Sequence, residues 1–357
     1  MSWLQNNSNI KIKALLYGHQ DFIRVVKVCP FTNQAITGSN DHTVRTWNVN
    51  QGVCDRILIG HDSTVSCLTV LRNNLIISGG ADHSIRLWDS RNGVGSECVG
   101  KLQHVSGVND LTCWSDLNDF SNDYLIYSVG QDSKLNVWDI RKLGSDDSST
   151  NNHSNVSSYS FDIMSGSSFG GNTSSFGSHI MDSTEHCKIN SISTNFGTPF
   201  CCHVGKIKDK SVIFVGSTNG SLQALSLNDD HSYTIEKRYN SHYSDITCLS
   251  VENDILVSGD NSNHVKIFSV ENSEPIISLS EHSDKVTSCQ VIGSHVYSGS
   301  IDGTICQYSL DASNKSVKLL RTIERLSMQV FSLCVSKDKY LYCGSDEEAL
   351  RCWDLNL

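Results

Sequence analysis

The chain repeats a set of residue types from which hydrolases build a catalytic triad. A histidine is followed by a serine or threonine, and an aspartate comes four residues after that hydroxyl. In an esterase or protease the hydroxyl would attack a carbonyl carbon, the imidazole would take its proton, and the carboxylate would orient the imidazole. The sets, each with the aromatic residue that follows, are His19, Thr37, Asp41 and Trp47; His61, Ser78, Asp82 and Trp88; His104, Ser128, Asp132 and Trp138; and His282, Ser298, Asp302 and Tyr308.

The repetition argues against catalysis, because an enzyme needs one nucleophile with one oxyanion hole. A buried indole N–H needs an acceptor, which the hydroxyl supplies, and the imidazole can then link that hydroxyl to the carboxylate. We therefore predict structural networks that each stiffen one repeat. The fourth, fifth and seventh repeats have lost the set, which predicts a molecule that is stiffer on the side of the first three. No catalytic residue is assigned.

The spacing of these residues indicates the elements that position them. His19 and His61 are 42 positions apart, His61 and His104 are 43 apart, and His242 and His282 are 40 apart. Each repeat contains short segments in which polar and apolar residues alternate, as in β-strands with one buried side. Seven such segments can be counted: 37–48, 78–89, 128–139, 215–226, 258–269, 298–309 and 343–354.

A period of about 40–45 residues with Gly-His and Trp-Asp marks is typical of WD40 repeats, and the chain resembles the WD40-repeat family over nearly its whole length. The resemblance implies an all-β fold, a seven-bladed WD40 β-propeller, as a single domain over residues 1–357. The last repeat lacks an outer strand. We expect residues 10–16 to pair with it and close the ring, because closure removes an exposed sheet edge.

One segment interrupts the period. Residues 144–185 lie between the expected third and fourth strands of blade three and consist mainly of serine, asparagine, glycine and aspartate. This composition is typical of disorder, so we expect a disordered, low-complexity insertion there.

Composition narrows the classes of partner. A net charge of −10 and a pI of about 5.7 argue against direct binding of nucleic acid, which requires a basic face. The sequence has no apolar run long enough for a membrane span and no secretory signal at its start. Fourteen cysteines without a CxxC motif are interpreted as reduced thiols rather than disulfides or a zinc site. We expect a monomeric protein of the cytoplasm, the nucleus or both, with no metal or cofactor.

The resemblance also implies a binding platform that has no chemistry of its own and holds peptides or protein subunits. The commonest docking site in the family is the top face, formed by the His loops and the Asp turns. The residues expected there are Phe22, Arg24, Asn40, Ser66, Asn109, Gln131, Cys201, Tyr243, Thr247, Thr287 and Phe331. Arg24 has no aspartate at the matching position of neighbouring blades, which favours an acidic or phosphorylated group on the partner.

Two alternatives remain open. Residues 76–91 and 126–141 both end in Trp-Asp-x-Arg and resemble the box by which many WD40 proteins dock on the adaptor of cullin-4 ubiquitin ligases. That resemblance would make Arg91 and Arg141 adaptor contacts and the chain a substrate receptor, whereas a local role would pair each arginine with Asp89 or Asp139. An enzyme that uses the central channel is the weakest alternative.

Overall fold

A computed structural model describes residues 11–71, 75–89, 98–114, 124–143, 187–193, 197–228, 232–311, 316–325 and 328–355. The predicted insertion over 144–185 and Arg91 lie outside the described residues. Within the described part, every element is a β-strand except the 3-10 helix η2 (Ile140–Lys142), so the chain is all-β as predicted.

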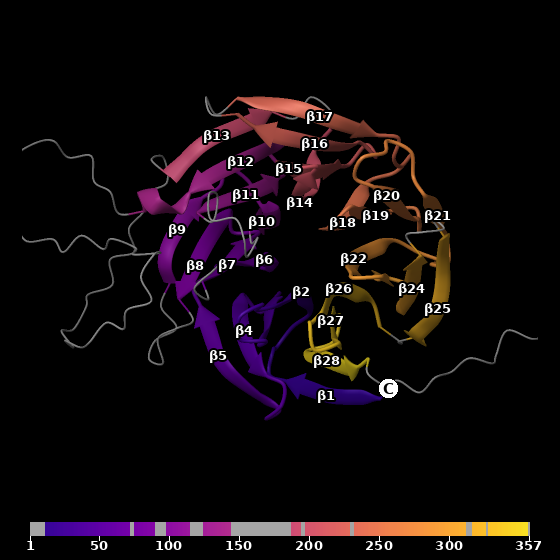
Figure 1. Cartoon of the computed structure of the whole chain (residues 1–357). Coiled ribbons are helices and arrows are strands. Elements are labelled where there is room, and N and C mark those ends of the chain that lie inside the picture. Colours follow the sequence, from indigo (N-terminus) through magenta and orange to yellow (C-terminus); the bar gives the residue numbers. More distant parts are fainter. Residues whose placement is uncertain are drawn as a thin grey trace, which may run out of the picture.

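The strands form seven antiparallel sheets of four strands, arranged as blades in a ring (Figure 1). The first strand of each blade lines the axis and the fourth forms the rim (Figure 1). The first six blades are β2 (Ile23–Val28), β3 (Ala35–Ser39), β4 (Thr43–Asn48), β5 (Val53–Ile59); β6 (Val65–Leu71), β7 (Leu75–Gly80), β8 (Ser84–Asp89), β9 (Cys98–Gln103); β10 (Val108–Cys113), β11 (Leu125–Gly130), β12 (Lys134–Asp139), β13 (Lys188–Ser193); β14 (Pro199–Ile207), β15 (Lys210–Ser217), β16 (Leu222–Leu227), β17 (Tyr233–Tyr239); β18 (Ile246–Glu252), β19 (Ile255–Asp260), β20 (Val265–Ser269), β21 (Ile277–Leu279); β22 (Val286–Ile292), β23 (His295–Ser300), β24 (Thr304–Asp311), β25 (Ser316–Arg325).

The seventh blade joins the two ends of the chain. It consists of β26 (Val330–Val335), β27 (Tyr340–Ser345), β28 (Ala349–Asp354) and, as its outer strand, β1 (Ile12–Tyr17). β1 runs antiparallel to β28, with Tyr17 opposite Ala349 and Ile12 opposite Trp353. Leu16 of β1 is buried in a cluster with residues of the first and last blades. The predicted closure of the ring is confirmed.

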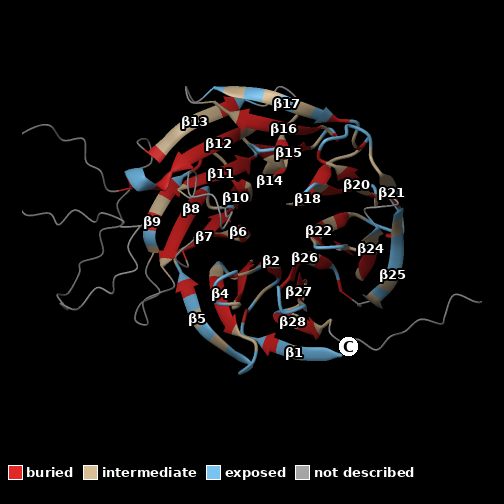
Figure 2. Cartoon of the chain, in the orientation of Figure 1, coloured by how far each residue is buried: buried red, intermediate tan, exposed pale blue. Residues whose placement is uncertain are grey.

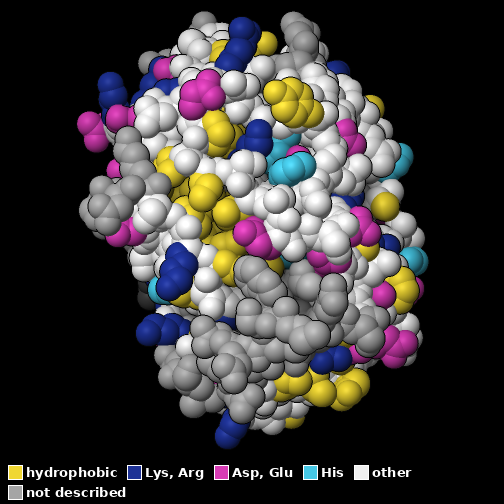
Figure 3. All heavy atoms as spheres, turned by 90° about the vertical axis from the view of Figure 1, so that its right-hand side faces the viewer, with side chains coloured by type: hydrophobic (Ala, Val, Ile, Leu, Met, Phe, Trp, Pro, Cys, Tyr) yellow, Lys and Arg dark blue, Asp and Glu magenta, His cyan; other side chains and the backbone are white. Residues whose placement is uncertain are grey.

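Burial falls from the middle of each blade to the rim. β7 and β11 are buried along their whole length, whereas the rim strands β5 and β17 alternate between exposed and partly buried residues (Figure 2). Apolar clusters fill the spaces between neighbouring blades, so the core is itself a ring. On the side of the ring that carries β21 and β25, hydrophobic side chains gather in one area among scattered charged ones (Figure 3).

The glycine before the histidine has a steric reason in the first two blades. A Cβ on Gly18 would lie 2.8 Å from Arg45 Nη1 and 3.1 Å from the Trp47 ring, and Gly60 meets Arg86 and Trp88 at the same distances. In blade three, where the third strand has Asn136 in place of this arginine, Gln103 stands in place of the glycine. In these two blades glycine precedes the histidine because the arginine and the tryptophan leave no room for a side chain.

Candidate functional site

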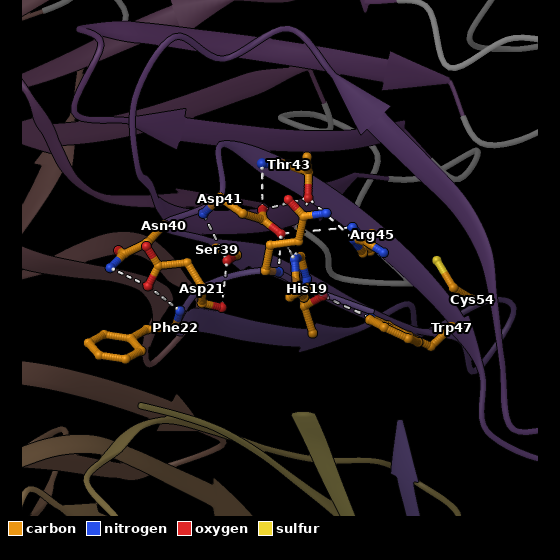
Figure 4. Close-up of polar contacts among 12 residues, drawn as sticks. His19, Asp21, Phe22, Ser39, Asn40, Asp41, Thr43, Arg45, Trp47 and Cys54 are labelled. Atoms are coloured by element: carbon orange, nitrogen blue, oxygen red, sulfur yellow. Dashed lines mark hydrogen bonds and ion pairs between the residues drawn. The ribbon is translucent and has the colours of Figure 1, made fainter. Parts of the chain in front are cut away.

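The first blade assembles a continuous network around its histidine (Figure 4). Trp47 Nε1 donates to Thr37 Oγ1 at 2.8 Å, Thr37 Oγ1 lies 2.6 Å from His19 Nε2, and His19 Nδ1 lies 2.7 Å from Asp41 Oδ2. Since the hydroxyl accepts from the indole, it can donate to Nε2, and Nδ1–H then donates to the carboxylate. The second blade brings Trp88, Ser78, His61 and Asp82 together at 2.9, 2.7 and 2.8 Å.

Burial and hydrogen bonding set the charges of this network. Burial lowers the pKa of His19, so the imidazole is neutral near pH 7. Burial alone would raise the pKa of Asp41, but hydrogen bonds from His19 and Thr43 outweigh it and hold that pKa well below its usual range. A neutral imidazole thus donates to an ionised carboxylate, which matches the direction of the hydrogen bonds.

These networks have the geometry of a hydrolase triad, but a substrate cannot reach their hydroxyl groups. The hydroxyl-bearing Thr37 and Ser78 both have 0% exposed surface, and a tryptophan covers each of them. A nucleophile must reach the carbonyl carbon that it attacks, at roughly 3 Å. Neither hydroxyl can do so, and the role of both sets is structural.

The fifth blade contains a network that the sequence pattern missed. His242 Nδ1 lies 2.8 Å from Asp260 Oδ2, and His242 Nε2 lies 2.7 Å from Ser258 Oγ. The aspartate comes two residues after the serine instead of four, and its other oxygen accepts the backbone N–H groups of Ser262 and His264. Ser258 follows His242 by 16 residues, as Ser298 follows His282, and that spacing could have indicated the network.

The third blade departs from its prediction. His104 Nε2 accepts from Asn136 Nδ2 at 2.8 Å, and its Nδ1 lies 3.0 Å from a backbone carbonyl. Trp138 still donates to Ser128 at 2.8 Å, but Asp132 Oδ2 is buried with no hydrogen-bond partner among the described residues. The prediction that His104 joins Ser128 to Asp132 was wrong, because the amide of Asn136 competes for the imidazole where the first two blades have arginine.

The sixth blade keeps half of its predicted set. His282 Nε2 lies 2.7 Å from Ser298 Oγ, while Nδ1 lies 2.8 Å from Thr304 Oγ1 and 3.5 Å from Asp302. Tyr308 donates its hydroxyl to Glu281 Oε2 at 3.3 Å. A phenol hydroxyl extends from the far end of its ring and reaches the residue before the histidine, where the first two blades have glycine. The histidine joins a hydroxyl to an aspartate in blades one, two and five, so the prediction that blade five had lost these residues was wrong.

The seventh blade has an indole without an acceptor. Trp353 Nε1 is buried and unpaired within the described part of the chain, and Cys343 stands where the first three blades have threonine or serine. Sulfur is a weak acceptor. We expect Cys343→Ser to raise the free energy of unfolding by about 1 kcal/mol, because the hydroxyl accepts from the indole. Urea denaturation measures the change, and Cys334→Ser on β26 of the same blade is the control. A Cys343→Ser protein no more stable than the control would contradict this account.

A channel runs along the axis, and the first strand of each blade contributes one bulged residue to its lining. In all seven strands the pairing with the second strand shifts at the second residue, which marks a β-bulge. The channel has a volume of about 910 Å³. The seven bulged residues all line it: Arg24, Ser66, Asn109, Phe200, Thr247, Thr287 and Phe331.

In blade four the bulged residue differs from the predicted one. Cys201 was expected at the bulge of blade four, but Phe200 occupies it and Cys201 is buried in a cluster with Phe214 and Ile246. Blade four has no histidine from which to count, and a slip of one residue along a strand exchanges the two faces of the sheet. Phe200 and Cys201 both line the channel, and the centroid of the Phe200 ring lies 5.7 Å from Lys285 Nζ.

Most bulged residues link neighbouring blades. Ser66 Oγ donates to the carbonyl of Val108 at 2.5 Å, Thr287 to that of Val330 at 2.6 Å, and Thr247 to that of Val286. Asn109 Nδ2 donates to the carbonyl of Pro199 at 3.3 Å. The polar atoms of these four predicted top-face residues are therefore engaged in holding the ring together.

Two other bulged residues, Arg24 and Phe331, form a cluster with Phe22. The ring centroids of Phe22 and Phe331 are 6.1 Å apart, and the Arg24 guanidinium lies 4.5 Å from the centroid of Phe331 and 5.9 Å from that of Phe22. Arg24 Nε donates to Asn40 Oδ1 at 2.8 Å. Phe22 is 39% exposed, and in Figure 4 its ring points away from the His19 network. The structure thus brings four predicted top-face residues into one group.

The remaining predicted top-face residues lie apart from this cluster. Tyr243, in the loop after His242, is fully exposed, with a relative exposure of 103%. Gln131 is exposed in the turn between β11 and β12. Exposed apolar side chains thus occur in top-face loops of several blades, with Val105 after His104 as a further example.

The arginine of the second adaptor-like box has a local role. Arg141 Nη2 lies 2.6 Å from Asp139 Oδ2, Nε donates to the same carboxylate, and the guanidinium lies 3.2 Å from the centroid of Tyr124. The hydrogen bond from Arg141 to Asp139 raises the pKa of Arg141 further. This is the pairing expected from a local role, although the side chain remains 52% exposed.

Within the described ranges, no group of three histidine, cysteine or acidic residues could hold a metal ion. In the same part of the chain, no helix has the length and apolar character needed to cross a membrane. All fourteen cysteines lie within the described ranges as thiols, and most are buried.

Comparisons with known proteins agree with this architecture. The family model "WD domain, G-beta repeat" matches residues 10–48, 52–89, 96–139, 233–269 and 273–309, more than half of the chain. The crystal structure of RRP9 WD40 repeats superposes with a TM-score of 0.72 at 15% identity, covering 97% of this chain and 99% of that one. A structure of U3-55K gives 0.71 at 15% identity, covering 96% and 98%. At this identity the likeness shows the fold alone.

Curated relatives match over short stretches. F-box and WD repeat domain containing protein 10B of Homo sapiens is 34% identical over 67 residues, 18% of this chain and 9% of that protein. An uncharacterized WD repeat-containing protein of Schizosaccharomyces pombe is 29% identical over 109 residues, 30% and 28% of the two chains. Cell division control protein 4 of Saccharomyces cerevisiae is 35% identical over 63 residues, 18% and 8%. The chain spans less than a third of the length of these relatives.

Proposed function

The chain belongs to the WD40 family, and from this we propose that it is a non-enzymatic scaffold that holds a peptide or a protein subunit on its top face. WD40 propellers are typical protein-interaction platforms. The proposal places the partner over the mouth of the central channel, where the loops of several blades converge.

The cluster of Phe22, Arg24 and Phe331 carries this proposal. Aromatic and arginine side chains concentrate binding energy in protein interfaces. Two phenylalanines from neighbouring blades here flank a guanidinium at the channel mouth. The hydrogen bond to Asn40 fixes the orientation of Arg24, and within the described ranges Arg24 forms no ion pair. Such a group favours a partner that places a carboxylate or phosphate on Arg24 and an apolar side chain on the rings.

The setting of the protein is part of the proposal. Fourteen cysteine thiols support a reducing compartment, the cytoplasm or the nucleus. The net charge of −10 opposes self-association and supports a monomeric propeller that works as a subunit of a larger complex.

Quantitative affinity purification with mass spectrometry tests the top-face site. We expect Arg24→Glu with Phe331→Ala to reduce the recovery of the main partner at least about tenfold, because the variant loses both the charge and the ring that anchor the partner. Lys337→Glu at the opposite end of the channel is the control and should recover the partner normally. Equal recovery with all three proteins would contradict a top-face site.

The same purification tests the ligase alternative. Recovery of a cullin-4 adaptor with the wild-type chain, and its loss with Arg141→Asp, would favour the substrate-receptor role. We rank this role second, because Asp139 and Tyr124 already account for the position of Arg141.

A further inference from the structure

Lys27 places a positive charge inside the central channel. It is the fifth residue of β2, its side chain is exposed, and it lines the channel three residues further along the strand than Arg24. At about 3.3 Å per residue, the two positions are about 10 Å apart. Within the described ranges, the ammonium group of Lys27 forms neither an ion pair nor a hydrogen bond. Its charge is therefore available to a ligand in the channel.

Asp110 lines the same channel, but its carboxylate already holds two blades together. Its Oδ2 accepts the backbone N–H of Cys202 at 2.9 Å, and its other oxygen accepts that of the next residue at 2.8 Å. Ser288 and Ser332, at the equivalent positions of blades six and seven, also accept an N–H of the following blade. Burial raises the pKa of Asp110, and the charge of Lys27 offsets only part of this effect. Asp110 therefore leaves Lys27 without a direct partner.

The charges along the channel favour the entry of an anion from the top face. The charged lining residues of the mouth and the middle are Arg24, Lys27, Lys285 and Asp110, and those of the bottom end are Glu252, Lys337 and Asp338. The first group has an excess of positive charge and the second an excess of negative charge. His203 adds no charge at pH 7, because burial lowers its pKa to about 4. An anion that approaches the top mouth is therefore attracted inward, whereas the bottom end repels it.

The size of the channel fits a single extended chain. Spread over the roughly 20 Å length of a six-residue strand such as β2, its volume of about 910 Å³ gives a cross-section of roughly 45 Å². One strand in stacked sheets occupies about the same area, because strands lie about 4.8 Å apart and sheets about 10 Å apart. A loop would pass through the channel twice to reach Lys27 and return, whereas a chain end passes through once. The end of a polypeptide is therefore the occupant that the channel fits.

We propose that the channel receives the carboxy-terminal tail of a partner protein from the top face, with the terminal carboxylate on Lys27 and an acidic side chain on Arg24. The carboxyl end is selected over the amino end because Lys27 attracts a carboxylate and repels an ammonium group. Hydrogen bonds between an ammonium group and a carboxylate are among the stronger ones in proteins. This assignment rests on the proposed top-face function and adds to it the end of the partner chain that enters the channel.

Fluorescence anisotropy with two peptides tests the proposal on the full chain. Both peptides carry a label at the amino end, a glutamate three residues before the last residue, and a phenylalanine before that glutamate for the rings of Phe22 and Phe331. They differ only in a free or an amidated carboxyl end. We expect the free acid to bind at least about tenfold more tightly, because only the free acid has a carboxylate for Lys27. Equal affinities, which would indicate an internal segment, or no measurable binding of the free acid would overturn the proposal.

Two substitutions with opposite effects locate the terminal carboxylate. Lys27→Gln removes the ammonium charge, so it should weaken the free acid at least about tenfold and the amide less than about twofold. Asp110→Asn keeps an oxygen for the N–H of Cys202 and removes a charge that repels the tail, so it should strengthen binding of the free acid at least about threefold. It remains informative if Lys27→Gln fails to fold. The exposed Lys318 of the rim strand β25 provides the matched control, and Lys318→Gln should change neither affinity. Unchanged binding of the free acid to a folded Lys27→Gln protein, or to Asp110→Asn, would overturn the assignment.

Affinity purification distinguishes a failure of tail insertion from a failure of the top-face site. We expect Lys27→Gln to reduce the recovery of the main partner at least about fivefold, because the partner loses the contact of its terminal carboxylate. Recovery that falls with Arg24→Glu and Phe331→Ala but not with Lys27→Gln would overturn tail insertion and leave the top-face site in place. Recovery that the Arg24 and Phe331 substitutions do not change would contradict the top-face site itself.

Discussion

Removal of residues 1–17 is expected to abolish the stable monomer. β1 pairs with β28 over five residues, and its loss leaves the edge of β28 open next to the buried Trp353. An open edge pairs with other chains, so we expect aggregation or dimers and a fall in melting temperature of more than about 10 °C. Size-exclusion chromatography with light scattering and thermal denaturation measure both effects. Deletion of residues 1–10 alone keeps β1 and is the control.

A pair of substitutions separates the packing of β1 from its mere presence. Leu16 has 1% exposed surface, while its neighbour Leu15 on the opposite side of the strand has 39%. Leu16→Asp buries a charge in the cluster that joins the first and last blades and should cost at least about 4 kcal/mol. Leu15→Asp should cost less than about 1 kcal/mol. A truncated chain that stays monomeric and melts normally, or equal effects of the two substitutions, would show that the ring does not depend on this closure.

Asp260→Ala is expected to destabilise the propeller by about 3 kcal/mol. The substitution removes an ionised acceptor of His242 and of two backbone N–H groups, and it leaves a buried imidazole N–H without a partner. Equilibrium denaturation in urea measures the change. The result would establish that the fifth blade holds a working network although its sequence does not show the usual spacing.

Two controls in the same chain make this prediction specific. Ser262 occupies the position at which the repeat pattern places the aspartate, and its side chain is exposed, so Ser262→Ala should change stability by less than about 0.5 kcal/mol. Asp132→Ala in blade three should cost less than about 1 kcal/mol, because Asp132 Oδ2 has no partner among the described residues and Oδ1 accepts one long hydrogen bond, from Lys134 N at 3.2 Å. A loss with Asp132→Ala as large as with Asp260→Ala would contradict the description of the two networks.

The sequence alone determined the features that repeat with the chain. Alternating polar and apolar residues set the strands, and the recurring Gly-His and Trp-Asp marks set the number of blades. The role of residues 10–16 followed from the missing outer strand of the last repeat. These properties depend on local pattern and on counting, so they could be inferred without coordinates.

Tertiary structure decided which side chains meet. Asp260 reaches His242 from a different spacing, and Asn136 displaces Ser128 from His104, because competition for a hydrogen bond depends on positions in space. Phe200 occupies the bulge of blade four at which Cys201 was expected, because the register of a strand depends on its pairing in space. A cavity between blades three and four combines residues from two repeats whose common period does not predict it. Repeats specify the scaffold through short-range pattern, whereas a site arises from differences between repeats that only the packed ring brings into contact.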